Sequence, residues 1–467
     1  MNSRKYMFLI LIIFIFNIHM TDTGYCWSLS KASKPYKGQT ITISLMIGYE
    51  VNKILLDKVI PEFKKKTGIN VEVQFVPYQE VIPQHTRILK SKDSKYDLIN
   101  VDNIWFPFYK PYLENIDQFI KDSKLSMPKF NISDFIPELL QGYQWEENTY
   151  CFPSTFEFPL LMVRKDLFKK ADFIDKNGKI IPPKNLDEYY EYAKKLTQDI
   201  DNDGKIDVYG TTLHGYKTGI FDEAISWYWG SGGELLDKSL NPIFGNALLI
   251  KTMKIYSNIY HHGYASPEST AWELGEAATA FRTGKAAMSW NWTMVAPWVL
   301  DPKLSYVADK VEFIKLFKED TKRVHYLREA SNALCIPKNS NNKKAAFLFM
   351  QFYTSPVIQE TYVSDQYRIH PSRKSIIFSG KYASQVPYAT IQRDVIKNHE
   401  IRLCPKIPEY TDIDQIVAMR FQQIMTGDLS AQIGIEQAVV DVQKLLSQGN
   451  YYEGNKSYTP IFSGIYK

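Results

Sequence analysis

The chain has 467 residues, of which 45% are hydrophobic, and its formal net charge is +5. This composition predicts a globular protein with a full core, and the length is enough for two or more domains. The charge is small for this size, and no block of Lys and Arg is interleaved with aromatic residues, so nucleic-acid binding is not expected. Aromatic residues are abundant at 14% of the chain, with 31 Tyr and 9 Trp.

The N-terminus has the pattern of a secretory signal. Two basic residues precede an unbroken apolar run at residues 7–16, which is too short for a membrane-spanning helix of about 20 residues. Cleavage is expected after Cys26 or Ser28. Tyr25 does not fit the small residue that lipid attachment at Cys26 would require. Residues 1–28 are therefore predicted to be a signal peptide, and the mature protein to be exported, soluble and without a lipid anchor.

Beyond residue 38, the hydrophobic pattern alternates between strand and helix. Runs of β-branched residues predict strands, and apolar residues at helical spacing, closed by a lysine-rich turn and Gly68, predict a helix. The predicted elements are strands at 41–47, 69–76, 96–101, 311–316 and 333–336, and helices at 52–67, 79–90, 185–197 and 247–261. This order is typical of an α/β fold with a mostly parallel sheet.

One segment carries the sharpest local pattern. A helix runs into Gly284, a strand follows at 286–290, and Trp290 and Trp292 stand two residues apart. Residues two apart on a strand point to the same face, so the two indoles could form an apolar platform for a ligand. Packing of both rings in the core is the alternative, and spacing alone does not decide between them.

This segment, with its Gly-Lys pair and its Ala-Met-x-Trp strand at 287–290, resembles the extracellular solute-binding proteins of family 1, the sugar-type receptors of ABC importers. Similar elements are Lys-Asp-Leu-Phe at 165–168 and Pro-Lys-x-Ser at 337–340, and the matching segments span roughly residues 40–445. The resemblance implies an α/β, two-lobed, maltose-binding-protein-like periplasmic binding protein fold of type II, with discontinuous lobes and hinge crossovers. The expected lobes comprise residues 38–153 plus 293–327 and residues 154–292 plus 328–467.

Strand ends and crossovers supply the candidates for ligand binding, because open α/β sheets bind their ligands there. A sugar packs its C–H faces on aromatic rings and pairs its hydroxyls with amide, carboxylate or guanidinium groups. Each candidate also has a purely structural alternative, in the core or in a surface pair. Trp227 and Trp229 are expected to flank a Gly-rich turn, and Trp290 and Trp292 to enter the second crossover. The candidates are Tyr49, Glu50, Asp102, Asn103, Trp105, Phe156, Glu157, Trp227, Trp229, Trp290, Trp292, Arg328, Asn332 and Arg368.

Residues 199–207 have the spacing of a calcium loop. Aspartates occupy positions 1, 3, 5 and 9, and Gly204 stands at position 6, where the chain turns sharply. Position 12 is Gly210, so the bidentate Glu of an EF-hand is missing. Four carboxylates in nine residues repel one another without a cation, so a structural Ca²⁺ is predicted, with a solvated acidic turn as the alternative. The expected ligands are Asp199, Asp201, Asp203, Asp207 and the carbonyl of Lys205.

Cys151, Cys335 and Cys404 remain after signal cleavage, and their spacing matches neither a zinc site nor a disulfide-dense scaffold. One disulfide with one thiol left over is compatible with this set. Buried cysteines are the simpler account. The sequence does not indicate which two residues would pair.

The sequence predicts a periplasmic, monomeric receptor that closes on a sugar or oligosaccharide and delivers it to the transmembrane subunits of an ABC permease. An anionic solute such as a glycerophosphate is the alternative ligand, with Arg328, Arg368 and Arg373 meeting its charge. A secreted glycoside-cleaving enzyme is the alternative activity, because paired carboxylates cannot be recognised from sequence. Since the sequence contains no nucleophile elbow, zinc motif or phosphate loop, no catalytic residues are predicted.

Overall fold

The computed structural model describes residues 27–46, 49–91, 94–315, 327–328, 331–363 and 370–449. The predicted signal, with Cys26, lies outside these ranges except for its last two residues. Ser28 caps the N-terminus of α1 (Leu29–Ser33), and the Trp27 indole donates a hydrogen bond to the Lys124 carbonyl at 3.3 Å. No helix within the described ranges is long and apolar enough to cross a membrane.

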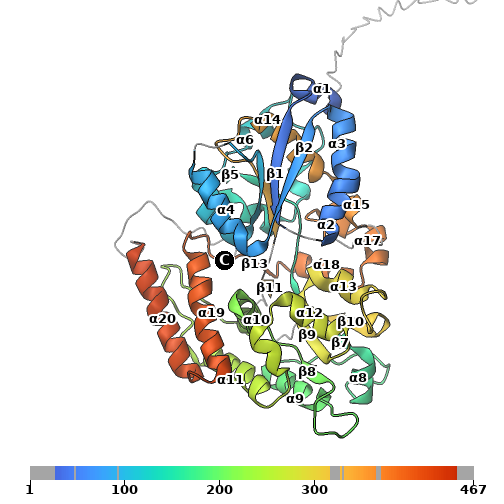
Figure 1. The fold of residues 1–467 in the computed structure, drawn as a ribbon, viewed down its shortest axis with the longest axis vertical. Coiled ribbons are helices and arrows are strands. Elements are labelled where there is room, and N and C mark those ends of the chain that lie inside the picture. Colours follow the sequence, from blue (N-terminus) through green and yellow to red (C-terminus); the bar gives the residue numbers. More distant parts are fainter. Residues whose placement is uncertain are drawn as a thin grey trace, which may run out of the picture.

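The chain forms two lobes, one above the other in Figure 1. The first lobe contains a five-stranded sheet, in which β1 is parallel to β2 and β3, and β12 is antiparallel to β3 and β6. In spatial order the strands are β2 (Asn70–Val76), β1 (Thr40–Met46), β3 (Leu98–Asp102), β12 (Asn332–Cys335) and β6 (Cys151–Pro153). Its helices are α1, α2 (Tyr49–Ile54), α3 (Ile60–Thr67), α4 (Tyr78–Lys90), α5 (Phe106–Tyr109), α6 (Asp117–Lys121), α7 (Pro137–Gly142), α14 (Lys343–Tyr353) and α15 (Pro356–Tyr362).

The second lobe contains a four-stranded sheet. β7 is antiparallel to β10 and β9, and β8 is parallel to β9. In spatial order the strands are β10 (Val311–Ile314), β7 (Pro159–Arg164), β9 (Ala286–Trp292) and β8 (Tyr209–Thr211). Its helices are α8 (Lys165–Lys170), α9 (Leu186–Leu196), α10 (Lys217–Gly230), α11 (Ala247–His261), α12 (Leu274–Arg282), α13 (Ala296–Leu300), α19 (Tyr410–Thr426) and α20 (Ala431–Gln448).

Short elements join the lobes. α16 packs against α15 of the first lobe, and Tyr388, which precedes α18, packs against Phe313 of β10 with ring centroids 4.9 Å apart. The hairpin β4 (Gln144–Trp145) and β5 (Asn148–Thr149) packs against α7 of the first lobe. The short elements between the lobes are α16 (Lys374–Ile377), α17 (Gly380–Gln385), α18 (Ala389–Lys397) and the pair β11 (Leu327–Arg328) and β13 (Ile401–Arg402). They place the C-terminal quarter of the chain across the junction.

Glycines end several helices, as the sequence predicts for Gly68 and Gly284. Gly68 after α3, Gly284 after α12 and Gly427 after α19 have φ values of +72°, +85° and +86°, a conformation that glycine adopts without a steric penalty. The predicted helix at 52–67 is interrupted by a π-helical segment, Leu55–Val59. Pro61, at the start of α3, has no N–H to donate to the preceding turn.

Strand pairing differs from the expected lobe boundaries. Residues 293–327 were assigned to the first lobe, but β10 pairs with β7 in the second sheet. Residues 328–467 were assigned to the second lobe, but β12 pairs with β3 and β6 in the first. After β9 the chain returns through α13 to β10, so Trp290 and Trp292 do not enter a crossover. The second crossing lies between Ile314 and Asn332.

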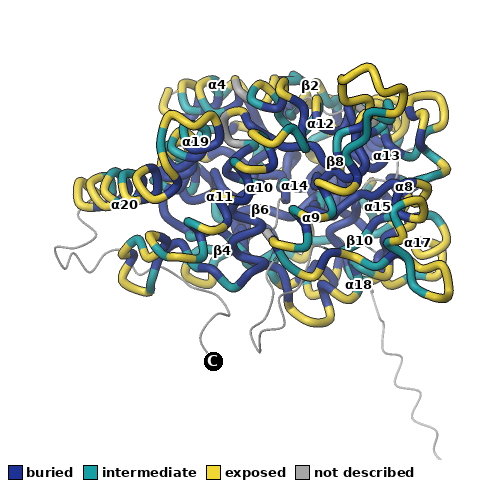
Figure 2. Tube along the Cα trace, turned by 90° about the horizontal axis from the view of Figure 1, so that it is seen from below, coloured by how far each residue is buried: buried dark blue, intermediate teal, exposed yellow. Residues whose placement is uncertain are grey.

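The core comprises two clusters of buried apolar residues. One fills the first lobe between its sheet and α3 and α14, where Phe63 and Phe349 meet edge to face at 5.0 Å. The other begins on the opposite face of the same sheet and fills the second lobe. It continues between them through Phe156 and Phe158 of the first crossing, residues 154–158, which joins β6 to β7. Figure 2 shows the buried chain running through the whole molecule, with exposed residues on the outer turns and along α20. The lobes therefore share apolar packing at their junction.

Candidate functional site

The carboxyl end of β3 lies beside the start of β12 in the first lobe. Asp102 is the register partner of Asn332, and its carboxylate accepts a hydrogen bond from the Ile104 N–H at 3.2 Å, which caps the 3₁₀ turn Asn103–Trp105. The Asn103 N–H donates to the Ser331 carbonyl at 3.1 Å. Among the described residues, the buried side-chain oxygen of Asn332 has no hydrogen-bond partner. Three of the predicted ligand-binding residues therefore meet at one sheet edge.

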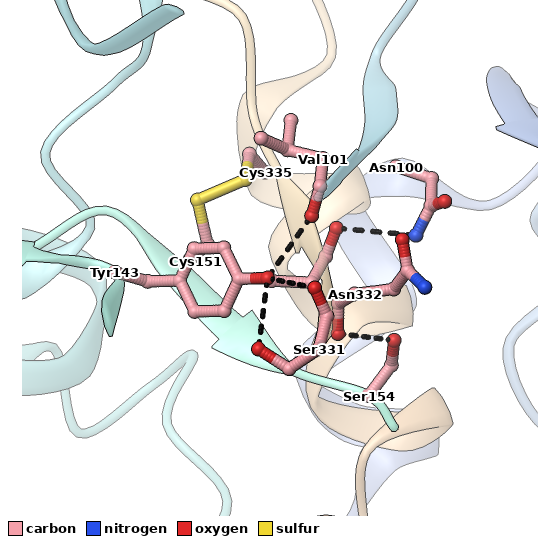
Figure 3. The surroundings of a disulfide bond; sticks show 9 residues. Asn100, Val101, Tyr143, Cys151, Ser154, Ser331, Asn332 and Cys335 are labelled. Carbon is pink, nitrogen blue, oxygen red and sulfur yellow. Dashed lines mark hydrogen bonds between the residues drawn. A yellow bond between two sulfur atoms is a disulfide. The ribbon is translucent and has the colours of Figure 1, made fainter. Parts of the chain in front are cut away.

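A disulfide and a tyrosine hold this edge in place (Figure 3). Cys151 of β6 and Cys335 of β12 are register partners and form the disulfide. The Tyr143 hydroxyl lies 2.6 Å from the Ser331 carbonyl oxygen and 3.1 Å from that of Val101. Of the two alternatives, one disulfide or three buried thiols, the structure contains the disulfide. Cys404 is the cysteine left over, and it is buried.

Aromatic residues follow the same strand end. Trp105 is buried, and its ring centroid lies 4.9 Å from that of Tyr78, which is 44% exposed. The second-lobe helix α19 packs against the 3₁₀ turn that carries Trp105, and also against α10. The two lobes therefore meet at this turn.

The four candidate tryptophans of the second lobe are all buried, and Trp292, at 5% exposure, belongs to the same core cluster as the others. Trp290 is fully buried, 5.3 Å from His214, and Trp227 is fully buried between Tyr189 and Tyr256. These two rings form part of the core, the alternative that spacing left open. Trp292 ends β9, with its ring 5.7 Å from that of Trp290. Of the two residues predicted as a platform, Trp292 is the one next to the junction.

Trp227 and Trp229 lie within the last turns of α10, ahead of the glycine turn that they were expected to flank. The Arg402 guanidinium stacks over Trp229 at 4.7 Å and forms a bidentate ion pair with Glu234. Arg402 was not predicted from the sequence, since its partners are 168 or more residues away. Arg402, held by its ion pair with Glu234, therefore covers one face of the Trp229 ring.

Two further predicted residues lie in the first crossing. Phe156 is fully buried and stacks on Phe158 at 5.2 Å. The Glu157 carboxylate is buried and accepts hydrogen bonds from Thr293 and His370 at 2.7 Å and 2.8 Å. His370 is also bonded to Tyr388 through its second ring nitrogen. One carboxylate oxygen of Glu157, Oε2, is therefore hydrogen-bonded to two side chains of the protein.

Other predicted residues cannot be placed, or are engaged elsewhere. The side chains of Tyr49, Glu50 and Arg328 and all of Arg368 lie outside the described residues. Arg373 is fully buried, with its guanidinium 4.1 Å from the Phe135 ring, 3.3 Å from the Asp134 carboxylate and 2.6 Å from the Thr354 carbonyl. Within the first lobe, Arg373 thus pairs with Asp134.

A buried acid lies behind the second-lobe tryptophans. Glu223 of α10 accepts hydrogen bonds from the backbone N–H of His214 and from the Tyr256 hydroxyl, both at 2.8 Å. Burial raises the pKa of Glu223 from 4.5 to about 8, and burial lowers the pKa of His214 from 6.5 to about 3. Because both groups are neutral at pH 7 in the folded protein, they add no charge to the second-lobe interior.

The acidic loop is compact. Oxygens of Asp199, Asp201 and Asp207 lie within 4.8 Å of one another. The Gly204 N–H donates to Asp199 at 3.0 Å, and the Lys205 N–H to Asp203 at 2.8 Å, which turns the chain around the carboxylates. At position 12, a Cβ on Gly210 would stand 1.8 Å from the Ala193 carbonyl oxygen. Packing of β8 on α9 thus explains why this loop has no twelfth-position Glu.

Comparison with known proteins shows one family. The family of bacterial extracellular solute-binding proteins matches residues 51–360. A probable amino-acid ABC transporter periplasmic-binding protein of Sinorhizobium fredii is 24% identical over 329 residues, 70% of this chain and 71% of that protein. The mannitol-binding protein of Pseudomonas aeruginosa is 23% identical over 339 residues, 69% of this chain and 75% of that protein.

Solved structures show the same fold. Maltose-bound MalE3 of T. maritima superposes with a TM-score of 0.75 at 22% identity, over 87% of this chain and 99% of that one. A solute-binding protein of Agrobacterium radiobacter in complex with ribitol gives 0.76 at 23% identity, over 88% and 99%. The predicted two-lobed α/β binding-protein fold is confirmed.

Proposed function

The chain belongs to the family of bacterial extracellular solute-binding proteins, and from this premise we propose that it binds a sugar or sugar alcohol between its lobes and delivers it to an ABC permease. Proteins of this family are the binding components of ABC transporters and not enzymes. The predicted absence of catalysis follows from family membership, and the glycoside-cleaving alternative is set aside.

The observation that carries the proposed ligand class is the sheet edge formed by Asp102, Asn103 and Asn332. It offers carboxylate and amide groups, with the Asn332 side-chain oxygen unpaired among the described residues. Such a group costs about 1–3 kcal/mol when buried without a partner, which a ligand hydroxyl would recover. Trp105 and Trp292, which are 2% and 5% exposed, would supply one aromatic ring from each lobe for the C–H faces of a sugar.

The relatives' ligands support a neutral polyhydroxylated solute. Structures related to this chain hold ribitol, D-mannitol and maltose. Of the three arginines that an anionic ligand was expected to use, Arg373 is engaged within the first lobe. A glycerophosphate is the alternative ligand, because the side chain of Arg328 and all of Arg368 lie outside the described residues.

Calorimetry on residues 27–467, unfolded and refolded to remove carried-over ligand, tests the proposal. Mannitol, ribitol, maltose, glutamine and glycerol 3-phosphate form the panel. We expect 1:1 binding of a sugar or polyol with a Kd of about 1 µM, equivalent to about −8 kcal/mol. Asn332→Ala should weaken binding at least tenfold, with Asn241→Ala, at an exposed turn of the second lobe, as the control. Binding of glycerol 3-phosphate or glutamine alone would contradict the ligand class.

We also propose that the loop at 199–207 holds a structural Ca²⁺. The clustered carboxylates and the exposed carbonyl of Lys205 are oxygen ligands of the kind that Ca²⁺ takes. The ion would offset the mutual repulsion of the aspartates and fix the loop between α9 and β8, away from the lobe junction.

A Ca²⁺ titration of chelator-treated protein tests this second proposal. We expect Ca²⁺ to raise the Tm, Mg²⁺ to raise it less, and Asp201→Asn to abolish the increase. Asp237→Asn, in another acidic turn of the same lobe, is the matched control. A Tm that is independent of Ca²⁺ would exclude a structural ion here.

A further inference from the structure

The first crossing changes its partners from one lobe to the other within four residues. The Thr155 N–H donates to the carbonyl of Asn332 in the first sheet at 3.3 Å. The Phe158 N–H donates to Thr293 Oγ1 at 3.2 Å, and the Thr293 N–H returns a bond to the Phe158 carbonyl at 3.0 Å, at the end of β9 in the second sheet. Glu157 lies between these two sets of contacts.

The third crossing, which leads from α15 of the first lobe to α19 of the second and includes residues 370–372, lies against the same segment. Thr155 and Pro371 form an isolated antiparallel bridge, and the Phe156 N–H donates to the His370 carbonyl at 3.2 Å. Ser372 donates to the Pro153 carbonyl at 2.7 Å. The first and third crossings therefore run side by side where the chain passes between lobes.

Glu157 joins these segments through its side chain. Its Oε2 accepts from Thr293 Oγ1 and from His370 Nδ1. Because a carboxylate accepts hydrogen bonds, Nδ1 of His370 donates to Glu157, and its Nε2 is hydrogen-bonded to the Tyr388 hydroxyl before α18. Thr293, His370 and Tyr388 are all fully buried or nearly so. We call these four residues the Glu157 cluster.

We propose that the Glu157 cluster is the pivot of the hinge, which holds the crossings together so that the ligand-free lobes keep a narrow range of relative angles. Hinge rotation is absorbed by backbone torsions of a few residues in the crossings. Displacements are smallest at the axis, so contacts there persist while the lobes rotate. Buried hydrogen bonds to a carboxylate are strong, and losing one partner leaves a buried acceptor unpaired.

The cluster also connects to the proposed site, and this part of the inference rests on the proposed function. Thr293 directly follows Trp292, whose backbone pairs with Pro159 just after the pivot. A solute that contacts Trp292 therefore acts on the end of β9 that the cluster anchors. Glu157 is on this account a positioning residue, in place of the ligand contact that its sequence position indicates.

Inter-lobe distances measured by pulsed electron spin resonance on the ligand-free protein test the pivot. Spin labels are attached at Lys65 of α3 and Lys194 of α9, which are both exposed. Thr293→Val keeps the shape of the side chain and removes the hydroxyl, and Thr293→Ser keeps the hydroxyl as the matched control. Glu157→Ala removes the central carboxylate of the cluster. If the Glu157→Ala variant does not fold, Thr293→Val still tests the proposal.

We expect Thr293→Val to broaden the inter-lobe distance distribution at least twofold while its circular dichroism stays native, and Thr293→Ser to match the wild type. An unchanged distribution, or a single narrow distance at a new value, would overturn the pivot. No ligand is present in this measurement. A wild type that binds no sugar in calorimetry would thus refute the proposed function and leave this result unaffected.

Discussion

Removal of the Cys151–Cys335 disulfide should lower the free energy of unfolding by about 5 kcal/mol. The bond joins residues 184 apart in sequence, and the chain-entropy relation for a loop of this length gives about 5 kcal/mol at 25 °C. The loop contains the whole second-lobe sheet, from β7 to β10. If the second lobe stayed folded, the flexible part would shrink to roughly 30 residues, and the relation would still give about 4 kcal/mol.

The assay compares three proteins by equilibrium unfolding in urea, followed by tryptophan fluorescence and far-UV circular dichroism. These are the oxidised wild type, the wild type reduced with dithiothreitol, which creates no cavity, and Cys151→Ala/Cys335→Ala. Cys404→Ala controls for the loss of a buried sulfur outside the bond. The reduced protein should unfold at a lower urea concentration. A reduced wild type within about 1 kcal/mol of the oxidised protein would refute the chain-entropy reasoning, since reduction removes the bond alone.

Three further predictions follow from two buried ionisable residues and from the contacts of Trp27 and Ser28. Glu223 holds a proton in the folded protein up to a pKa of about 8 and loses it at 4.5 when unfolded, so its contribution to stability falls by about 3 kcal/mol between pH 4.5 and 7. In thermal melts, Glu223→Gln should remove this fall and raise the Tm at pH 7. If the Tm difference between the variant and the wild type is no larger at pH 7 than at pH 4.5, the raised pKa of Glu223 is contradicted. The Lys406 ammonium donates to the Gln141 and Gln144 carbonyls at the end of α7; Lys406→Met should widen the inter-lobe distance distribution, and an unchanged one would show that this tie is dispensable. If the predicted signal peptide is removed, N-terminal sequencing of the mature protein should begin at Trp27, because the Trp27 indole and the Ser28 side chain make contacts within the fold; a start at Leu29 would contradict this.

The candidate site was only partly predictable. Asp102, Asn103 and Asn332 follow or begin buried strands, and a strand end is visible in the hydrophobic pattern, so the sequence located them and the register brought them together. Trp227, Trp290 and Trp292 are all part of one buried cluster, and only the tertiary structure shows that Trp292 ends its strand beside the first crossing, where it pairs with Pro159. Arg402 and the cluster around Glu157 have no local signal, because their partners lie up to 213 residues away.

The sequence by itself determined the α/β alternation, the helix ends at Gly68 and Gly284, and the family resemblance. These features depend on spacings of a few residues, which fix torsion angles and amphipathic faces locally. Only the tertiary structure decided that β10 joins the second sheet and β12 the first, and that Cys151 pairs with Cys335. Those choices depend on contacts between segments far apart in the chain. The free energy of these contacts comes from apolar surface that two segments bury together, so no single segment determines it.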